Sequence, residues 1–269
     1  MRDRAFVVLT RAAGILVLVF LLTPLVVVAG ASVNPGSFLT FPPTGISLRW
    51  YEAILSDRAW LSSFQLSLWL TAVATPVATV LGTFAGYAIT RWEYPGRGAL
   101  ALFMLSPLMV AEVLMGLAFL YYLTAFRLVG SVTGLLAAYV LVGVPYVART
   151  VAASLETLDP DLEVAAESLG ASRWRRLRTV VLPHVLPGVL AGATFTAVLA
   201  FGELAITLFI AGPSTTTLAM RIYTNVQFAA NPSVAAAATV VIVLAVVAVL
   251  ALERSGLATR GQQIGRTRT

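Results

Sequence analysis

The sequence contains no cysteine, no lysine and a single histidine, His184. The absence of cysteine excludes disulfides, thiolate zinc sites, iron–sulfur clusters and cysteine nucleophiles. One histidine argues against a metal site built from imidazoles. Because the P-loop motif requires a lysine, the chain cannot bind ATP through a motif of that kind. We therefore expect no cofactor and no metal in this chain.

Charged residues are also scarce. They make up 11% of the 269 residues, against about a quarter in ordinary soluble proteins. Apolar residues make up 59%, and they form uninterrupted runs instead of the amphipathic stripes that cover a soluble core. The composition predicts a protein that is buried in a lipid bilayer.

Six apolar runs are long enough to cross a membrane as helices, since a hydrocarbon core of about 30 Å requires about 20 residues at about 1.5 Å each. Four runs carry no charge, and the third and fifth contain one acid each, Glu112 and Glu203. Helices are expected because an open strand edge is unsatisfied in lipid. We predict an all-α, polytopic protein of six transmembrane helices that forms a single transmembrane domain over residues 1–269. The expected spans are residues 12–31, 61–90, 98–126, 128–148, 185–210 and 233–252.

All 18 basic residues are arginines, and their distribution predicts the topology. If the amino terminus is cytoplasmic, 14 of them face the cytoplasm, which follows the positive-inside rule. The net charge of +6 then reflects topology and not nucleic-acid binding. We predict that both termini are cytoplasmic. The outer arginines are Arg49, Arg58, Arg127 and Arg221, and the inner ones are Arg2, Arg4, Arg11, Arg91, Arg97, Arg149, Arg173, Arg175, Arg176, Arg178, Arg254, Arg260, Arg266 and Arg268.

The first run has a second interpretation as a cleaved signal peptide, because arginines precede it and small residues follow it. Its length exceeds the apolar core of about 7 to 15 residues found in signal peptides, so we predict a retained anchor. Residues 32–60 then form the longest external loop. Within this loop, residues 47–55 place apolar side chains on one helical face, which predicts a short helix at the membrane interface.

The sizeable polar region lies between the fourth and fifth runs, at about residues 155–184. Asp159 is suited to cap a helix that begins at Pro160, and Gly170 is suited to end it. The acids near its start complement the positive end of the helix. Its predicted apolar face consists of Leu162, Ala165, Ala166 and Leu169.

A second, basic helix is expected after the cap residue Ser172, with Trp174 on one side and arginines around the rest. We expect it to end at Leu182 and Pro183, at the membrane. A short amphipathic helix beside a basic one is typical of docking into a groove on a soluble partner. A helix that lies on the lipid surface is the alternative.

Residues 163–172 read Glu-Val-Ala-Ala-Glu-Ser-Leu-Gly-Ala-Ser, and Leu-Pro follows at 182–183. This pattern resembles the EAA loop of ABC-importer permease subunits, in which Glu-Ala-Ala is followed by a glycine and then by Leu-Pro. Val164 stands where that family has glutamate, and Glu163 lies one place earlier. Residues 82–88 are similar to the family's second helix and the cytoplasmic turn after it. Segments similar to the closing third of its polyamine-type branch occur at residues 201–203, 212–213, 217–218 and 231–232.

The resemblance implies that residues 159–172 contain the coupling helix, which sits in a cleft of an ATP-binding subunit and transmits its closure to the membrane helices. It implies three kinds of partner: a second and different permease chain, two ATP-binding subunits that hold ATP and Mg, and an external solute-binding protein. It implies a multi-pass protein of a prokaryotic plasma (inner) membrane, without enzymatic activity of its own. The implied docking residues are Asp161, Glu163, Ala165, Ala166, Leu169, Gly170, Ala171, Ser172 and Arg173.

An ionised carboxylate is costly in hydrocarbon, so Glu112 and Glu203 are expected to face a cavity or a partner. With Tyr87 they are the candidates for the solute pathway, and such acids favour a polyamine-like or other small cationic or amino solute. Structural pairing is the alternative for either acid. Because intramembrane acids also relay protons, a secondary carrier or channel is the alternative function, but it leaves the docking helix unexplained. An enzyme would need a catalytic constellation of acids, serine, lysine or histidine, and none is apparent.

Overall fold

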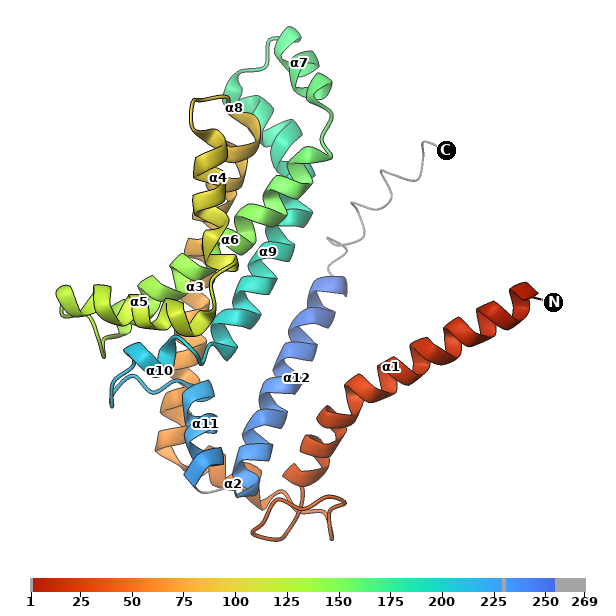
Figure 1. The fold of residues 1–269 in the computed structure, drawn as a ribbon, viewed down its shortest axis with the longest axis vertical. Coiled ribbons are helices and arrows are strands. Elements are labelled where there is room, and N and C mark those ends of the chain that lie inside the picture. The colour runs from red at the N-terminus through yellow and green to blue at the C-terminus, as the bar shows by residue number, and fades with distance from the viewer. Residues whose placement is uncertain (1, 229–230, 255–269) are drawn as a thin grey trace. The chain divides into compact units, whose positions relative to one another are not determined.

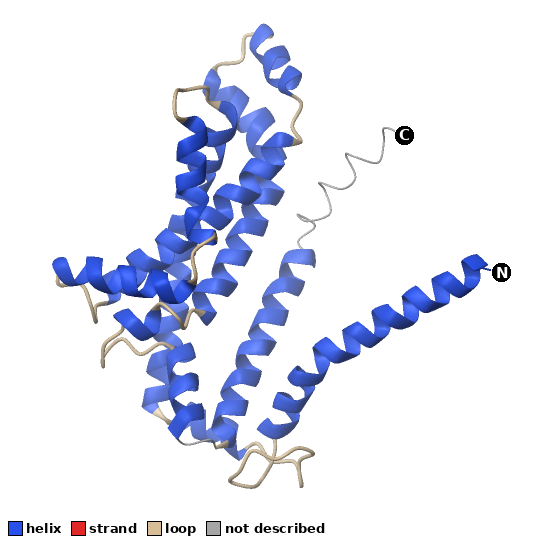
Figure 2. Cartoon of the chain, in the orientation of Figure 1, coloured by secondary structure: helices blue, strands red, loops and turns tan. Residues whose placement is uncertain are grey.

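A computed structural model describes residues 2–228 and 231–254. This part of the chain consists of helices joined by turns and loops, with no strand, which confirms the predicted all-α class (Figures 1 and 2). The helices are α1 (Arg2–Ser32), α2 (Arg49–Ser56), α3 (Arg58–Arg91), α4 (Arg97–Leu105), α5 (Glu112–Ala125), α6 (Val132–Glu156), α7 (Pro160–Ser168), α8 (Arg173–Arg176), α9 (Leu182–Gly202), α10 (Thr207–Ile210), α11 (Leu218–Phe228) and α12 (Pro232–Arg254). A 3-10 turn, η1 (Ser106–Leu108), follows α4, and a π-helical turn, η2 (Leu177–Val181), follows α8.

Several of these helices match the predicted spans. Among the described residues, four helices are long and apolar enough to cross a membrane: Leu9–Ser32, Arg58–Arg91, Val132–Glu156 and Arg173–Gly202. The bent pair Arg97–Leu108 and Glu112–Ala125 would provide a fifth span. The apolar stretch Pro232–Val247 of α12 is shorter. Arg260, Arg266 and Arg268, which the predicted topology places in the cytoplasm, lie outside the described residues.

The predicted span over residues 98–126 is not one continuous helix. The chain bends by 103° between η1 and α5. Pro107 lies in the 3-10 turn, where it has no N–H to continue an α-helix, and Ala111 is extended. As a result Glu112 begins α5, where the positive end of the helix dipole favours a carboxylate.

The expectation of one helix over residues 185–210 is wrong. Helix α9 ends at Gly202, and Glu203 has an extended backbone (φ −63°, ψ 114°). The Glu203 carboxylate accepts the N–H of Ile206 at 2.9 Å, so the side chain stabilises a turn in place of the next helical bond. Glu203 therefore lies in the break between α9 and α10 and not in the middle of a helix.

The basic loop helix does not end at Leu182 and Pro183, as the sequence predicted. Helices α8 and α9 are joined through η2 into one continuous helix, Arg173–Gly202, of 30 residues. Pro183 occupies the first turn of α9, directly after the wide π-helical turn. A proline is tolerated there because its missing N–H falls where the regular bonding pattern is already interrupted.

The chain forms two compact units, and the first contains Met1–Ser62 and Arg221–Val247. In this unit the buried Asn34 organises the loop after α1: its side-chain nitrogen donates to Thr40 Oγ1 at 2.5 Å, and its side-chain oxygen accepts from Thr44 Oγ1 at 3.0 Å. The indole of Trp50 donates to the Asn34 carbonyl at 3.0 Å. Helix α2 confirms the short helix predicted in this loop, and its position at a membrane interface stays a prediction.

The second unit contains Ser63–Met220 and the end of the chain from Ala248. Its interior is built by α3, α6 and α9, whose backbones meet at glycines. A Cβ atom at Gly86 would lie 2.7 Å from the Ala148 carbonyl oxygen, and one at Gly192 would lie 2.8 Å from the Val147 Cα. Such close contact shows that the three helices are tightly packed against one another. Its most deeply buried side chains include Leu70, Leu135, Val147, Val151, Leu155, Val181, Ile206 and Ile210.

Candidate functional site

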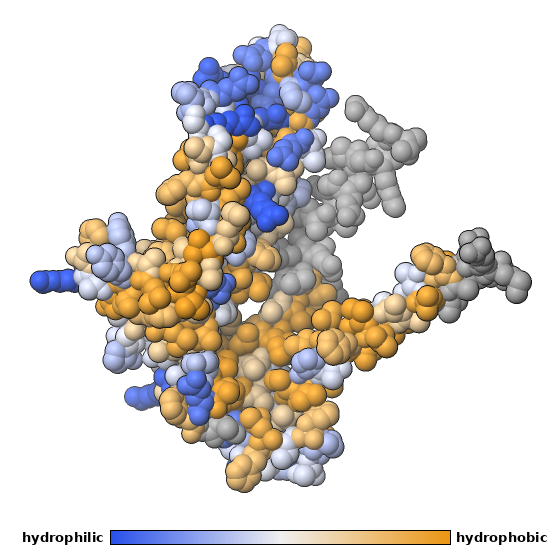
Figure 3. All heavy atoms as spheres, in the orientation of Figure 1, coloured by the Kyte–Doolittle hydropathy of each residue, from blue (hydrophilic) through white to orange (hydrophobic). Residues whose placement is uncertain are grey.

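The loop between α6 and α9 contains the helix that the sequence predicted. The Asp159 carboxylate accepts the N–H of Asp161 at 3.0 Å, and Pro160 is the first residue of α7. Gly170 follows the end of the helix with φ 79°, a conformation that residues with a side chain rarely adopt. The predicted cap and stop of this helix are therefore confirmed. Figure 3 shows hydrophilic residues gathered over α7 and α8 at this end of the second unit.

The turn from α7 into α8 is held by local bonds. The N–H of Ala171 donates to the Ala166 carbonyl at 3.0 Å, and the Ser172 hydroxyl accepts the N–H of Arg175 at 3.3 Å. These bonds satisfy backbone groups that helix ends leave open. Ala171 and Ser172, which the sequence assigned to docking, thus form the turn itself, and Arg173 begins α8 with an exposed side chain.

The apolar side of α7 is exposed in this chain. Leu162 is 53% exposed and Leu169 88%, and Ala165 is exposed on the same side. Val164 is 60% exposed as well, but it lies on the side of the helix that faces a groove with Glu163 and Glu167. Exposed apolar side chains on a short, well-capped helix are typical of a surface that docks against a partner.

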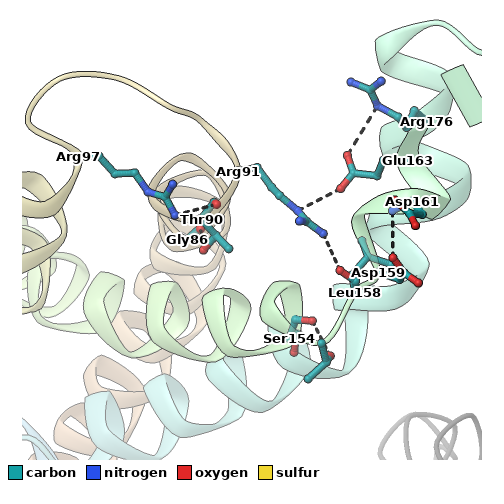
Figure 4. A network of polar contacts seen from close by, with 11 residues as sticks. Gly86, Thr90, Arg91, Arg97, Ser154, Leu158, Asp159, Asp161, Glu163 and Arg176 are labelled. Carbon is teal, nitrogen blue, oxygen red and sulfur yellow. Dashed lines mark hydrogen bonds and ion pairs between the residues drawn. The ribbon is translucent and has the colours of Figure 1, made fainter. Parts of the chain in front are cut away.

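Glu163 faces the opposite way, toward its own chain (Figure 4). Its carboxylate lies 3.0 Å from Arg91 Nε and 3.7 Å from Arg176 Nε, and its side chain is 14% exposed. The Arg91 contact is an ion pair without hydrogen-bond alignment of the Nε–H. Arg176 also contacts the exposed Glu167 at 2.5 Å. Glu163, which the sequence assigned to docking, is therefore occupied in fastening α7 to α3 and α8.

Two arginines complete this network, one at the end of α3 and one at the start of α4. Arg91 donates from Nη2 to the Leu158 carbonyl at 3.0 Å, which joins the end of α3 to the start of the loop. Arg97 donates to the carbonyls of Ile89 and Thr90 at 2.7 and 2.9 Å, so it caps the end of α3. The role of Arg91 in holding this loop was not predicted, because its partners lie far away along the chain. Its position at the end of a predicted span was the signal in the sequence that could have indicated it.

The two acids of the predicted spans line the same groove. Glu112 from α5 and Glu203 from the break after α9 both line an open groove of about 550 Å³. The rest of its wall is mainly apolar and includes Val198, Leu208 and Phe209. Two carboxylates in an apolar groove of this size provide negative charge for a small cationic ligand.

Glu203 also has a structural role, as the alternative interpretation anticipated. Besides the bond of its carboxylate to the Ile206 N–H, its carbonyl accepts from the Thr207 hydroxyl at 3.0 Å. Tyr139 on α6 bonds the same hydroxyl at 2.8 Å, so the break after α9 is tied to α6. The position of the carboxylate in the groove is thereby fixed by neighbouring bonds.

Tyr87 is not brought together with these acids. It lies near the end of α3, with its ring edge-on to Trp92 at 6.2 Å between centroids. It lines a separate groove beside α7 and α8, together with Arg91 and Trp174. The acids and Tyr87 therefore belong to two different surfaces of the second unit.

The chain matches the family model described as binding-protein-dependent transport system inner membrane component over residues 78–255, which include the α7–α8 loop and the acid-lined groove. The chain belongs to this family. It is a permease subunit of an ABC importer, and its relatives are transport permease subunits.

Two curated relatives of this permease are polyamine permeases of Escherichia coli (strain K12). It is 31% identical to the putrescine transport system permease protein PotI over 230 residues, which cover 83% of this chain and 82% of the relative. It is 29% identical to the spermidine/putrescine transport system permease protein PotC over 255 residues, which cover 92% of each chain.

A solved structure shares the fold of this permease. One chain of a bacterial alginate ABC transporter, in complex with an alginate pentasaccharide-bound periplasmic protein, matches with a TM-score of 0.68 and 16% identity. The match covers 99% of this permease and 95% of that chain. The bent and broken helices described above thus belong to an ABC-transporter permease fold.

Proposed function

We propose that this permease forms half of the membrane pathway of an ATP-driven importer and couples to ATP-binding subunits through residues 159–172. The observation that carries the proposal is the arrangement of α7. Ion pairs through Glu163 hold the helix on its own chain, while Leu162 and Leu169 remain exposed for a partner.

The proposed assembly contains a second, different permease chain, two ATP-binding subunits and an external solute-binding protein. ATP and Mg bind to the ATP-binding subunits, since this chain has no lysine for a P-loop. The permease lies in a prokaryotic inner membrane with six spans and both termini in the cytoplasm, as its arginine distribution favours. The complex of the alginate transporter with a periplasmic protein supports an external binding protein here.

The structure suggests how a movement of α7 would reach the solute. Closure of the ATP-binding subunits displaces α7, and the Arg91–Glu163 ion pair passes this displacement to α3. The continuous helix Arg173–Gly202, about 45 Å long, ends directly before Glu203 in the acid-lined groove. The loop and the groove are thus joined by one rigid element, as alternating access requires.

The groove and the relatives together favour a small cationic solute. Glu112 and Glu203 give the groove two carboxylates, which suits the ammonium groups of a polyamine or a similar amino compound. PotI and PotC are named for transport of putrescine and of spermidine and putrescine. We propose a polyamine-like solute, with Glu203 and Glu112 as its contacts.

One experiment distinguishes the ATP-driven importer from the alternative, a secondary carrier or channel. The assembled complex is reconstituted into vesicles with its solute-binding protein, and uptake of radiolabelled putrescine is measured with ATP or with a proton gradient alone. We expect uptake that requires ATP and the binding protein. Uptake driven by the proton gradient without ATP would instead establish the carrier.

In the same vesicles, Glu203→Gln is expected to raise the half-saturating putrescine concentration about tenfold, since a hydrogen bond to a charged group contributes about 1.5 to 3 kcal/mol. The glutamine keeps an oxygen that can accept the Ile206 N–H, so the turn is preserved while the charge is lost. Glu112→Gln tests the second carboxylate. Glu93→Gln, at an exposed position away from the groove, is the matched control. Unchanged uptake by both groove variants would exclude these acids as solute contacts.

A further inference from the structure

A second groove lies beside α7 and α8, and the proposed function assigns it no ligand. Its volume is about 780 Å³, and α7 lines it with Glu163, Val164 and Glu167. Its distinctive feature is the combination of arginine and tryptophan side chains in the rest of its lining: Arg91, Trp92, Arg173, Trp174 and Arg176.

The continuous helix α8–α9 sets the depth of this groove relative to the membrane. Arg178 precedes the buried Val181 by about 5 Å along the helix axis, and Arg173 precedes it by about 12 Å. These distances place the arginines in the headgroup layer if the apolar part of α9 spans the hydrocarbon. Trp92 and Trp174 are each about 60% exposed, and exposed tryptophans concentrate at this same depth.

The arginines in and beside the groove differ in the groups that they contact. Arg91 and Arg176 are neutralised by Glu163 and Glu167. Arg178 lies over the Trp174 ring at 4.6 Å, which fixes the ring in the wall. Arg173 is exposed at the rim, and its charge attracts an anion that enters from the membrane side.

We propose that this groove binds the headgroup of an anionic phospholipid of the inner leaflet, with Arg173 contacting the phosphate and Trp92 and Trp174 packing against the glycerol and upper acyl chains. Arg173 is thereby assigned to lipid instead of to the ATP-binding subunit. The bound lipid fills the space between the end of α3 and the α7–α8 turn, so it supports the base of the docking loop. This inference goes beyond the proposed function and rests on α9 spanning the membrane.

The test uses the purified full-length permease in mild detergent, supplied with equal amounts of phosphatidylglycerol and phosphatidylcholine, and native mass spectrometry to count retained lipids. We expect phosphatidylglycerol to be retained preferentially. Arg173→Gln should reduce its retention about fivefold, the effect of one arginine near an anionic headgroup. Glu167→Gln should increase retention, because it removes a negative charge from the same groove.

Arg58→Gln, at an exposed position at the opposite end of α3, is the control and should change nothing. Equal retention of the two lipids by the wild-type chain would overturn the proposal. It would also be overturned if Arg173→Gln kept its phosphatidylglycerol. Loss of the ATP-binding subunit from the purified complex of that variant would then make Arg173 a contact for an acidic protein segment. Glu167→Gln is expected to increase phosphatidylglycerol retention, so it tests the proposal independently if the Arg173→Gln variant folds poorly.

Discussion

Glu163→Ala is expected to lower uptake per ATP hydrolysed about tenfold while the permease still reaches the membrane in normal amounts. The substitution leaves Arg91 and Arg176 without their shared carboxylate at sites where both side chains are less than one-fifth exposed. Removal of one partner from a buried ion pair costs about 3 to 5 kcal/mol, part of which is lost as α7 detaches from α3. Uptake and ATP hydrolysis are measured together in the reconstituted complex.

Arg91→Ala should have a smaller effect than Glu163→Ala, because Glu163 keeps Arg176 as a partner. Glu167→Gln is the matched control: Glu167 is 69% exposed, and an exposed ion pair contributes about 0 to 1 kcal/mol. The double variant Arg91→Ala with Glu163→Ala should be less harmful than the sum of the two single variants. If the two effects simply added, the ion pair would not be the link between α7 and α3.

Gly170→Pro is expected to abolish ATP-driven uptake without preventing insertion. Gly170 has φ 79°, whereas proline fixes φ at about −65°, so the turn between α7 and α8 cannot form. Proline also removes the N–H that Gly170 donates to the Glu167 carbonyl at 2.9 Å. Uptake and membrane levels are measured for each variant in the same preparation.

Two milder substitutions at Gly170 separate the backbone conformation from side-chain volume. A Cβ atom there would meet nothing within 4 Å, so Gly170→Ala should cost about 1 to 2 kcal/mol through conformation alone. Gly170→Asn should be tolerated better, because asparagine adopts the left-handed conformation more readily. Full transport by Gly170→Pro would show that the turn has no part in coupling.

The sequence was sufficient to predict the elements of the α7–α8 loop because their signals are local. Asp159 and Ser172 cap the helices that follow them, and Gly170 adopts the conformation that few other residues accept. Each of these features depends on neighbours within a few residues, so the sequence pattern contains the whole cause.

The breaks in the membrane helices were not predicted, because the sequence is apolar on both sides of each break. Hydropathy is continuous through Pro107 and Gly202, yet the chain bends or ends a helix at both places. In lipid such breaks require other parts of the protein to satisfy the freed polar groups. At the break after α9, Thr207 bonds the Glu203 carbonyl locally, and Tyr139, which bonds the Thr207 hydroxyl, comes from the distant helix α6.

The direction in which the Glu163 side chain points from α7 also depends on tertiary structure. The sequence placed it with the docking residues because it lies on the coupling helix, but its partner Arg91 stands at the end of α3. The groove shared by Glu112 and Glu203 also depends on tertiary structure. Each acid was identified from the energetic cost of a carboxylate in hydrocarbon, whereas their common groove follows from the bend before α5.

Docking of α7 on an ATP-binding subunit is tested most directly by cross-linking. Because the chain has no cysteine, Leu169→Cys introduces a unique thiol at an 88% exposed position directly after α7. The control is Leu102→Cys on α4, at a position that is 73% exposed. A short thiol-to-amine cross-linker is added to the assembled complex, and the joined peptides are identified by mass spectrometry. Cross-links from Leu169→Cys to a P-loop ATPase, with none from Leu102→Cys, are the expected result, whereas equal yields from both variants or no link from Leu169→Cys would contradict docking through α7.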